Sequence, residues 1–194
     1  YGTLYLNGIE DSVFGKKTAK AKGIGAVSTA SQLVPNMAIY ENIFIISQGS
    51  YFKKLFPRRV YIAETCKLLD EAGLEDVSPT AGAWQLSVAE GHLVEIIKAS
   101  YMQTKILVLD DITAKYSEEE IKTLKRFLLK KKAQGLSIIF LTNRHMELFS
   151  IADKITVIRS GTTVAHLDHK PVTRNELLIH LRQGSSISKV GNSF

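Results

Sequence analysis

The sequence contains a single cysteine, Cys66, among 194 residues. An internal disulfide needs two cysteines, so a disulfide-stapled extracellular scaffold is excluded, and one free thiol fits a reducing compartment. The sequence also lacks an apolar run long enough to span a bilayer. Residues 1–6 have neither the charged start nor the long apolar core of a signal peptide. These features favour a globular chain without an internal disulfide framework.

Two glycine-containing stretches lack what a phosphate-binding loop requires. Gly15-Lys-Lys-Thr18 has no glycine at the upstream position of a P-loop and does not have the Gly-Lys-Ser/Thr order. Gly23-Ile-Gly25 lacks the third glycine of a dinucleotide-binding fingerprint. We therefore exclude both as nucleotide loops.

The composition is that of an ordinary globular protein, with 45% hydrophobic and 23% charged residues. The length suits one domain, or a domain with an inserted subdomain. The net charge is +6, and lysines cluster at 16–22 and 130–132. A basic surface can meet nucleic acid or an anionic membrane face, although such runs are more commonly solvated faces.

The most informative stretch is Lys105-Ile-Leu-Val-Leu-Asp-Asp-Ile-Thr113, a short aliphatic run that ends in two carboxylates. It predicts a strand buried on both faces, as at the centre of a parallel α/β sheet. Ligands bind at the carboxyl ends of the strands in such sheets. Asp110 and Asp111 either hold Mg²⁺ and orient water there or merely begin a loop. This stretch alone leaves both interpretations open.

The preceding segments change from strand patterns to helical patterns. Residues 1–35 predict short strands, with a hairpin turn at Asn7-Gly8. Residues 36–104 have helical spacing and predict a small helical subdomain, with one helix over 38–46 and another over 60–72. The apolar face of the second helix is predicted to contain Ile62, Cys66 and Leu69.

Capping boxes, in which Ser or Thr is followed three residues later by Glu, mark three helix starts. They occur at Ser87–Glu90, Ser117–Glu120 and Thr173–Glu176. The free N–H groups and positive dipole of a helix N-terminus can hold a phosphate, but ordinary capping needs no ligand, so both readings of Ser87 stay open. Further strands are predicted over 136–141 and 154–159, the latter turning back at Ser160-Gly161.

The order of these features resembles the ATP-binding cassette of ABC transporters, and within that family the subunits that energise monosaccharide import. Residues 23–45 resemble the Q-loop region and the start of the helical subdomain, 86–99 the signature motif and its helix, 106–113 Walker B, and 142–161 the switch-histidine loop with the strands after it. The resemblance implies an α/β fold with a P-loop NTPase-like core, incomplete at its N-terminus, and an inserted helical subdomain.

The resemblance also implies roles for individual residues. Asp110 matches the Walker B aspartate that holds Mg²⁺, and Asp111 stands at the catalytic glutamate position on a stem shorter by one methylene. General-base catalysis depends on hydrogen-bond reach, so the shorter stem weakens that role. Thr29 falls at the Q-loop glutamine. Asn143 falls at the switch histidine, and its amide can donate a hydrogen bond but cannot titrate near neutral pH.

Other departures from the family pattern concern the phosphate contacts. The two signature glycines after Ser87 correspond to Val88 and Ala89, whose side chains would crowd the close approach of a phosphate. Ser117 stands at the D-loop aspartate. No Gly-x-x-x-x-Gly-Lys-Ser/Thr motif occurs, so the N–H cradle and the lysine of Walker A are missing. Together these departures predict a degenerate ATPase site.

The same resemblance predicts four parts of the chain. They are an N-terminal β part of the core (1–35), the helical signature subdomain (36–104), the α/β core with Walker B-like and switch-like loops (105–166), and a C-terminal helix with a flexible tail (167–194). It also implies ATP and Mg²⁺ as ligands, a second cassette and membrane-spanning permease subunits as partners, and a place at the cytoplasmic face of the cell membrane. No nucleic-acid partner is expected.

The leading expectation is a cassette subunit, or a fragment of one, of a sugar-type importer with impaired catalysis. One alternative is a non-catalytic partner that holds a competent cassette in a dimer. Another is a soluble cassette on ribosomes or nucleic acid. That class usually has Asn-His-Leu-Asp after Walker B and Ser-His-Asp at the switch, where this chain has Ala114-Lys-Tyr-Ser117 and Thr142-Asn-Arg144.

Overall fold

A computed structural model of the chain describes residues 3–6, 8–11, 15–44, 57–102, 104–142 and 151–167. The chain divides into two compact units, residues 1–144 and 145–194, and each is described by itself. The predictions made for Asn143 and for the capping box at Thr173 lie outside the described residues.

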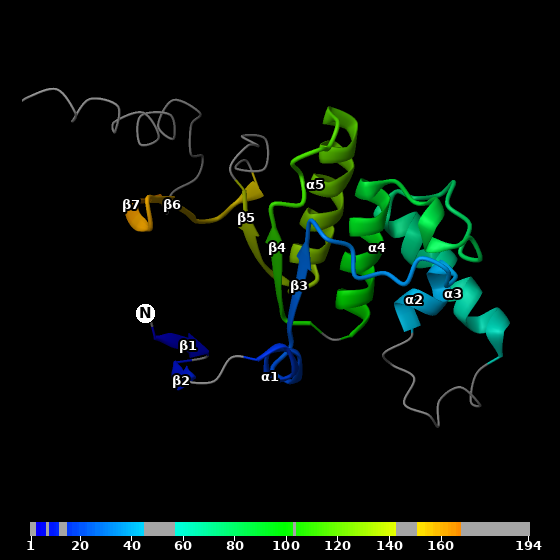
Figure 1. The fold of residues 1–194 in the computed structure, drawn as a ribbon, viewed down its shortest axis with the longest axis horizontal. Helices are drawn as coiled ribbons and strands as arrows, with labels where there is room; N and C mark the ends of the chain where they lie inside the picture. The colour runs from blue at the N-terminus through cyan, green and yellow to red at the C-terminus, as the bar shows by residue number, and fades with distance from the viewer. Residues whose placement is uncertain are drawn as a thin grey trace, which may run out of the picture. The chain divides into compact units, whose positions relative to one another are not determined.

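The first unit is built on a three-stranded parallel sheet in the order β3-β4-β5 (Figure 1). Its strands are β3 (Ile24–Ser28), β4 (Ile106–Asp110) and β5 (Ser137–Leu141). Parallel neighbours need a crossover connection. The helix α5 (Glu118–Ala133) makes the crossover from β4 to β5, whereas several helices lie between β3 and β4. The α/β class and the central position of the Lys105–Thr113 stretch are thereby confirmed.

The hydrophobic core of this unit lies between the sheet and its helices. The helix α4 (Val88–Tyr101) packs on β3, and in Figure 1 both α4 and α5 lie to the right of the strands. Leu107 and Leu109 of β4 are fully buried. The helices contribute Ile96, Ile97, Leu124, Phe127 and Leu128 to the core. Both predicted capping boxes are present, at Ser87 for α4 and at Ser117 for α5.

The prediction that the central strands are buried on both faces is wrong for the described part of the chain. Burial alternates along β4, where Ile106 and Val108 are only half-buried. On β5, Ile139 and Leu141 are 50% and 46% exposed. In the strand register these four residues share one face, because side chains alternate across a sheet and register partners point the same way. Helices cover only the opposite face among the described residues.

In residues 36–104, the stretch predicted as a helical subdomain, the structure has α2 (Ile39–Phe44), α3 (Arg58–Ala72), the short 3-10 turn η2 (Ala83–Gln85) and α4. The predicted apolar face of α3 is partly wrong. Leu69 is buried, but Cys66 is exposed and Ile62 only half-buried. Thr65 is buried instead. Its hydroxyl donates a hydrogen bond to the Tyr61 carbonyl at 2.8 Å, so the side chain can be buried without an unpaired polar group.

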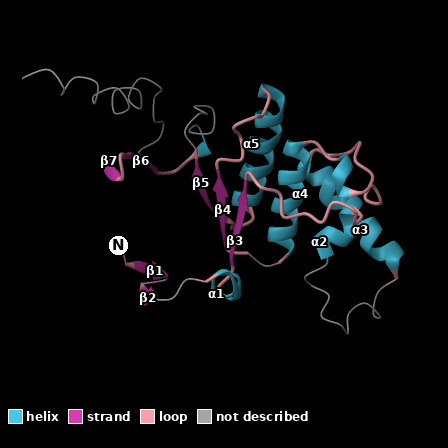
Figure 2. Cartoon of the chain, viewed as in Figure 1, coloured by secondary structure: helices cyan, strands magenta, loops and turns pink. Residues whose placement is uncertain are grey.

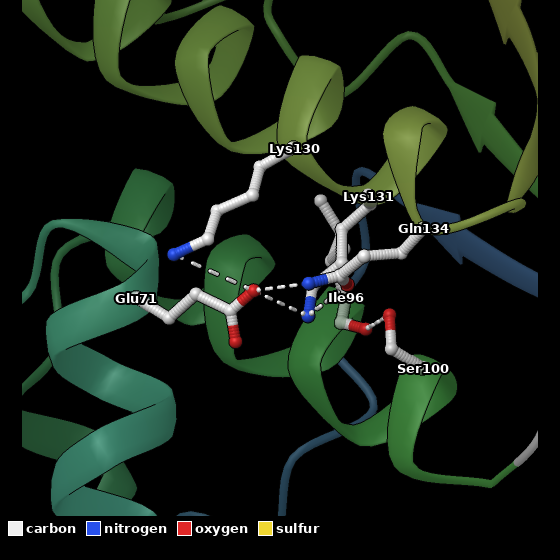
Figure 3. A network of polar contacts seen from close by, with 6 residues as sticks. All are labelled: Glu71, Ile96, Ser100, Lys130, Lys131 and Gln134. Atoms are coloured by element: carbon white, nitrogen blue, oxygen red, sulfur yellow. Dashed lines mark hydrogen bonds and ion pairs between the residues drawn. The ribbon is translucent and has the colours of Figure 1, made fainter.

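A polar network joins α3 to α5 (Figure 3). The Glu71 carboxylate accepts hydrogen bonds from Lys131 Nζ at 3.1 Å and from Gln134 Nε2 at 3.0 Å, and Lys130 Nζ lies 3.7 Å away. Burial alone would raise the pKa of Glu71, but these hydrogen bonds and the two lysine charges outweigh it and lower the pKa. Lys131 is itself buried. The network therefore satisfies a buried cation at the junction of the two helices.

Two hairpins complete the described elements (Figure 2). In the first unit β1 (Leu4–Leu6) pairs antiparallel with β2 (Ile9–Asp11), as the Asn7-Gly8 turn predicts, and α1 (Lys16–Ala21) follows. In the second unit β6 (Ile155–Arg159) pairs with β7 (Thr162–Leu167). Ser160 and Gly161 of that turn both have positive φ, as tight hairpin turns require. In the parts of the chain that are described, every helix is too short or too polar to cross a membrane.

Candidate functional site

The carboxyl edge of the parallel sheet gathers most of the core residues that the sequence singled out. Ser28, Asp110 and Leu141 are register partners, so β3, β4 and β5 end side by side. Thr29 follows β3 directly and Asp111 follows β4, which places both next to Asp110 at this edge. Asn143 follows β5 by two residues and lies outside the described residues.

The two aspartates differ in environment. Asp110 is exposed at the end of β4. Asp111 has φ +49°, a conformation that few residues other than glycine adopt but that Asp tolerates better than most. Its N–H donates to the Leu141 carbonyl at 2.9 Å, so the turn is fixed to the end of β5. Its Oδ1 is buried and has no hydrogen-bond partner among the described residues, and such a group calls for an explanation.

The arrangement of the aspartates fits a hydrated Mg²⁺ with nucleotide phosphates. Protein-bound Mg²⁺ is usually held by one or two carboxylates, with waters and substrate phosphates as further ligands. Asp110 offers an exposed carboxylate for such a role, and the orphaned Oδ1 of Asp111 is an acceptor that a water or a metal-bound water can satisfy. Bound there, Mg²⁺ would neutralise phosphate charge during phosphoryl transfer.

Ser87 is the N-cap of α4 and Ala89 lies in its first turn, and the helix begins with a capping box. Ser87 Oγ accepts a hydrogen bond from Glu90 N at 3.3 Å, and the Glu90 carboxylate accepts one from Ser87 N at 2.7 Å. Ala89 is buried, whereas Val88 is exposed beside it. The Glu90 carboxylate therefore places a negative charge at the positive end of the helix.

The loop that follows β3 is held in place by two buried polar side chains that the sequence reasoning missed. Glu95 of α4, 4% exposed, accepts hydrogen bonds from Ser31 Oγ at 2.8 Å and from Gln32 N at 2.5 Å. Asn42 of α2, fully buried, accepts from Val34 N at 2.7 Å and donates to the Val34 carbonyl at 3.0 Å. A polar residue inside an apolar helical run was the signal that could have identified both.

A third overlooked residue, His92, lies one turn before Glu95 on α4 and is 2% exposed. Its Nδ1 is 2.9 Å from the hydroxyl of Tyr116, and the two rings stack with centroids 5.9 Å apart. Burial lowers the pKa of His92, although the Glu95 charge and hydrogen bonding to the Thr29 and Ser28 backbone oppose the shift. Burial also raises the pKa of Tyr116, with the charges of Glu120 and Glu95 adding to the effect.

Comparison with known proteins finds sequence relatives among sugar transport and import ATP-binding proteins, although no family model matches the chain. It is 37% identical over 164 residues to the L-arabinose transport ATP-binding protein of Geobacillus stearothermophilus, covering 84% of the chain. It is 32% identical over 189 residues, 97% of the chain, to the xylose import ATP-binding protein of Moorella thermoacetica. The chain spans 32% and 37% of these two relatives, about a third of their length.

Solved structures with the same fold are ATP-binding cassettes from ABC transporters. A nucleotide-free cassette superposes with a TM-score of 0.74 at 20% identity and covers 99% of this chain and 78% of its own. A cassette in its ADP conformation superposes with a TM-score of 0.70 at 21% identity, covering 90% of this chain and 70% of its own.

Proposed function

Because the chain belongs to the ATP-binding cassette family, we propose that it is a nucleotide-binding part of a sugar-import ATP-binding protein, with impaired catalysis of its own. One observation carries the proposal. The register of the sheet brings Thr29, Asp110 and Asp111 to a single edge in a chain related to sugar-import ATP-binding proteins over almost its full length. The chain spans about a third of such relatives, so activity and substrate are proposed for the part and not carried over from the whole.

In this proposal Asp110 holds Mg²⁺ through water and Asp111 orients the attacking water. Thr29, which directly follows β3, and Asn143, which comes two residues after the end of β5 in the sequence, contribute hydrogen bonds to the nucleotide site. Ser87 and Ala89 present the start of α4 to nucleotide held by a partner cassette. The buried Oδ1 of Asp111, which has no hydrogen-bond partner in the described part of the chain, supports this role, because it is an acceptor that a water can satisfy.

Impaired catalysis follows from the side chains present at these positions. The Asp111 carboxylate stands on a stem one methylene shorter than glutamate, and general-base catalysis falls off steeply outside hydrogen-bond reach. Val88 replaces a glycine with an exposed branched side chain at the helix start. The Glu90 carboxylate accepts a hydrogen bond from Ser87 N and puts a negative charge at the helix end that a phosphate would approach. Each of these features weakens stabilisation of a transferring phosphoryl group.

The proposed partners are a second cassette and membrane-spanning permease subunits, with the chain at the cytoplasmic face of the membrane. The relatives named above are import or transport ATP-binding proteins. A cassette with weak catalysis would depend on a catalytically competent partner cassette for ATP hydrolysis. A second candidate function is a purely structural partner in such a dimer. The capping box of α4 favours it, because the N–H groups of Ser87 and Glu90 are already paired within the chain.

Calorimetric titration with Mg·ATP tests the proposal and separates the two candidates. We expect measurable affinity that depends on Mg²⁺ and falls about tenfold or more in Asp110→Asn, since that change removes the charge that faces the metal. ATP turnover should be far below that of intact cassettes. If the chain does not bind Mg·ATP, the structural role remains. If ATP turnover is comparable with that of intact cassettes and Asp111→Asn abolishes it, the proposal of impaired catalysis is refuted.

A further inference from the structure

The side of α4 that faces the carboxyl edge of the sheet contacts two loops through His92. The imidazole reaches Tyr116, in the connection between β4 and α5, through the 2.9 Å contact and a ring stack with an interplanar angle of 22°. It also interacts with the backbone of Ser28 and Thr29 at the end of β3. One buried side chain therefore lies between the two loops that carry the nucleotide-site candidates.

Glu95 strengthens the contact between α4 and the first of these loops. Three residues beyond His92 it lies on the same side of the helix, and it binds both Ser31 and Gln32. The loop from Ser28 to Gln32 is thus fixed to α4 by two consecutive turns of the helix. The loop that ends at Tyr116 is fixed to α4 by the His92 contact.

We propose that His92 is a positioning residue that couples the loop after β3 to the loop after β4. A change in the hydrogen bonding of one loop then alters the stability of the other. The ring can do this because a neutral imidazole has one donor nitrogen and one acceptor nitrogen. In this proposal the other ring nitrogen carries the proton and faces the Ser28 and Thr29 backbone, so that Nδ1 accepts the Tyr116 hydroxyl proton. If the contact on one side of the ring is lost, the ring is no longer held in the tautomer and orientation that the contact on its other side requires.

Protonation of His92 disturbs the same coupling. A charged imidazole carries N–H on both nitrogens, so the Tyr116 contact must reverse its donor or break. The groups that face the ring are Tyr116 from the β4–α5 loop and Glu95 from α4, with Glu120 acting on Tyr116. Glu95 is also committed to Ser31 and Gln32. Acid therefore acts on both loops at once.

Amide hydrogen exchange of the full chain without nucleotide tests the coupling. Tyr116→Phe removes the hydroxyl that contacts His92 and keeps the stacked ring. We expect exchange to accelerate about fivefold to tenfold in residues 111–117 and also in residues 28–32, which matches a hydrogen bond of about 1 kcal/mol. Acceleration confined to 111–117 would overturn the proposal. Ser100→Ala is the matched control, because it removes a 2.9 Å hydrogen bond to Ile96 at the other end of α4 and should leave both loops unchanged.

Two further measurements keep the test decisive if a variant folds poorly. In the unmodified chain, nitrogen chemical shifts of the His92 ring should show an unprotonated, hydrogen-bonded Nδ1 at neutral pH, and a protonated Nδ1 there would overturn the assignment. His92→Gln, which keeps a donor and an acceptor, should protect both loops better than His92→Ala, and equal loss in the two would count against coupling.

The inference rests on the proposed function only in naming what the two loops hold. Addition of Mg·ATP separates the two claims. If Mg·ATP leaves the exchange of both loops unchanged while Tyr116→Phe still accelerates both, the nucleotide function fails and the coupling stands. If Mg·ATP protects residues 111–117 and Tyr116→Phe does not reach residues 28–32, the coupling fails and the nucleotide function stands.

Discussion

Single buried polar side chains determine where the loops of this site lie, and Asn42 is the simplest case. Its amide both accepts from Val34 N and donates to the Val34 carbonyl, as well as to the Met37 and Ala38 carbonyls at 3.3 Å. The asparagine side chain thus supplies the hydrogen bonds that the backbone N–H and C=O groups of a helix or strand would otherwise give to one another. Asn42 therefore holds the Val34 part of the loop after β3, while Glu95 holds Ser31 and Gln32.

We expect Asn42→Ala to lower the free energy of unfolding by about 1–3 kcal/mol, because the Val34 backbone groups lose their partners and a buried volume is left empty. Chemical denaturation followed by fluorescence measures the change. Asn36→Ala is the control, since Asn36 is exposed in the same loop and should change stability by less than about 0.5 kcal/mol. Equal effects of the two substitutions would mean that the Asn42 hydrogen bonds do not hold the loop in solution.

The residues of the candidate site were predictable from the sequence only where their role follows from local order. Asp110 and Asp111 follow an aliphatic run, so the sequence predicts a strand end with two acids, and the structure places them there. His92 and Tyr116 are 24 residues apart, and nothing local indicates that one contacts the other. A contact of this kind exists only after the helices and the sheet have packed together.

At the scale of elements, helix starts were predictable and buried faces were less so. Ser87 and Ser117 cap their helices because a capping box involves only four consecutive residues. The buried face of α3 depends on what packs against it, so Thr65 is buried and Cys66 is exposed against the expectation from hydrophobicity. The same reason explains β5, whose aliphatic sequence indicates burial although its outer face has no covering helix among the described residues.

The two faces of the sheet should respond differently to truncation. We expect Leu107→Ala to cost about 2–5 kcal/mol, because Leu107 is fully buried under the helices and its loss leaves a cavity. Ile139→Ala, at a residue that is 50% exposed, should cost about 1 kcal/mol or less, since little apolar area returns to water. Urea midpoints of both variants measure the difference. A cost for Ile139→Ala equal to that for Leu107→Ala would indicate that something covers this face in solution.

At the scale of the whole molecule, two titratable groups, buried His92 and half-buried Glu71, link stability to pH in separate windows. His92 has its pKa lowered from the ordinary 6.5, chiefly by burial, so the unfolded chain binds its proton first as the pH falls. The stability that His92 supports is present above pH 6.5 and is lost below it. Glu71 has a pKa lowered from 4.5 by Lys131 and Gln134, which outweigh burial. Its contribution is present above pH 4.5 and is lost below it.

We therefore expect the urea midpoint of the full chain to fall from pH 6.5 to pH 5, and to fall again below pH 4.5. His92→Gln should flatten the first decline and leave the second, because glutamine has no proton to bind in this range. Glu71→Gln should preserve the first decline and weaken the second, since it removes the carboxylate of the α3–α5 network but leaves the imidazole untouched (Figure 3). Measurements at half-unit steps between pH 7.5 and pH 3.5 separate the windows. An undiminished first decline in His92→Gln would assign it to other histidines of the chain, and would mean that acid does not act on the site through His92.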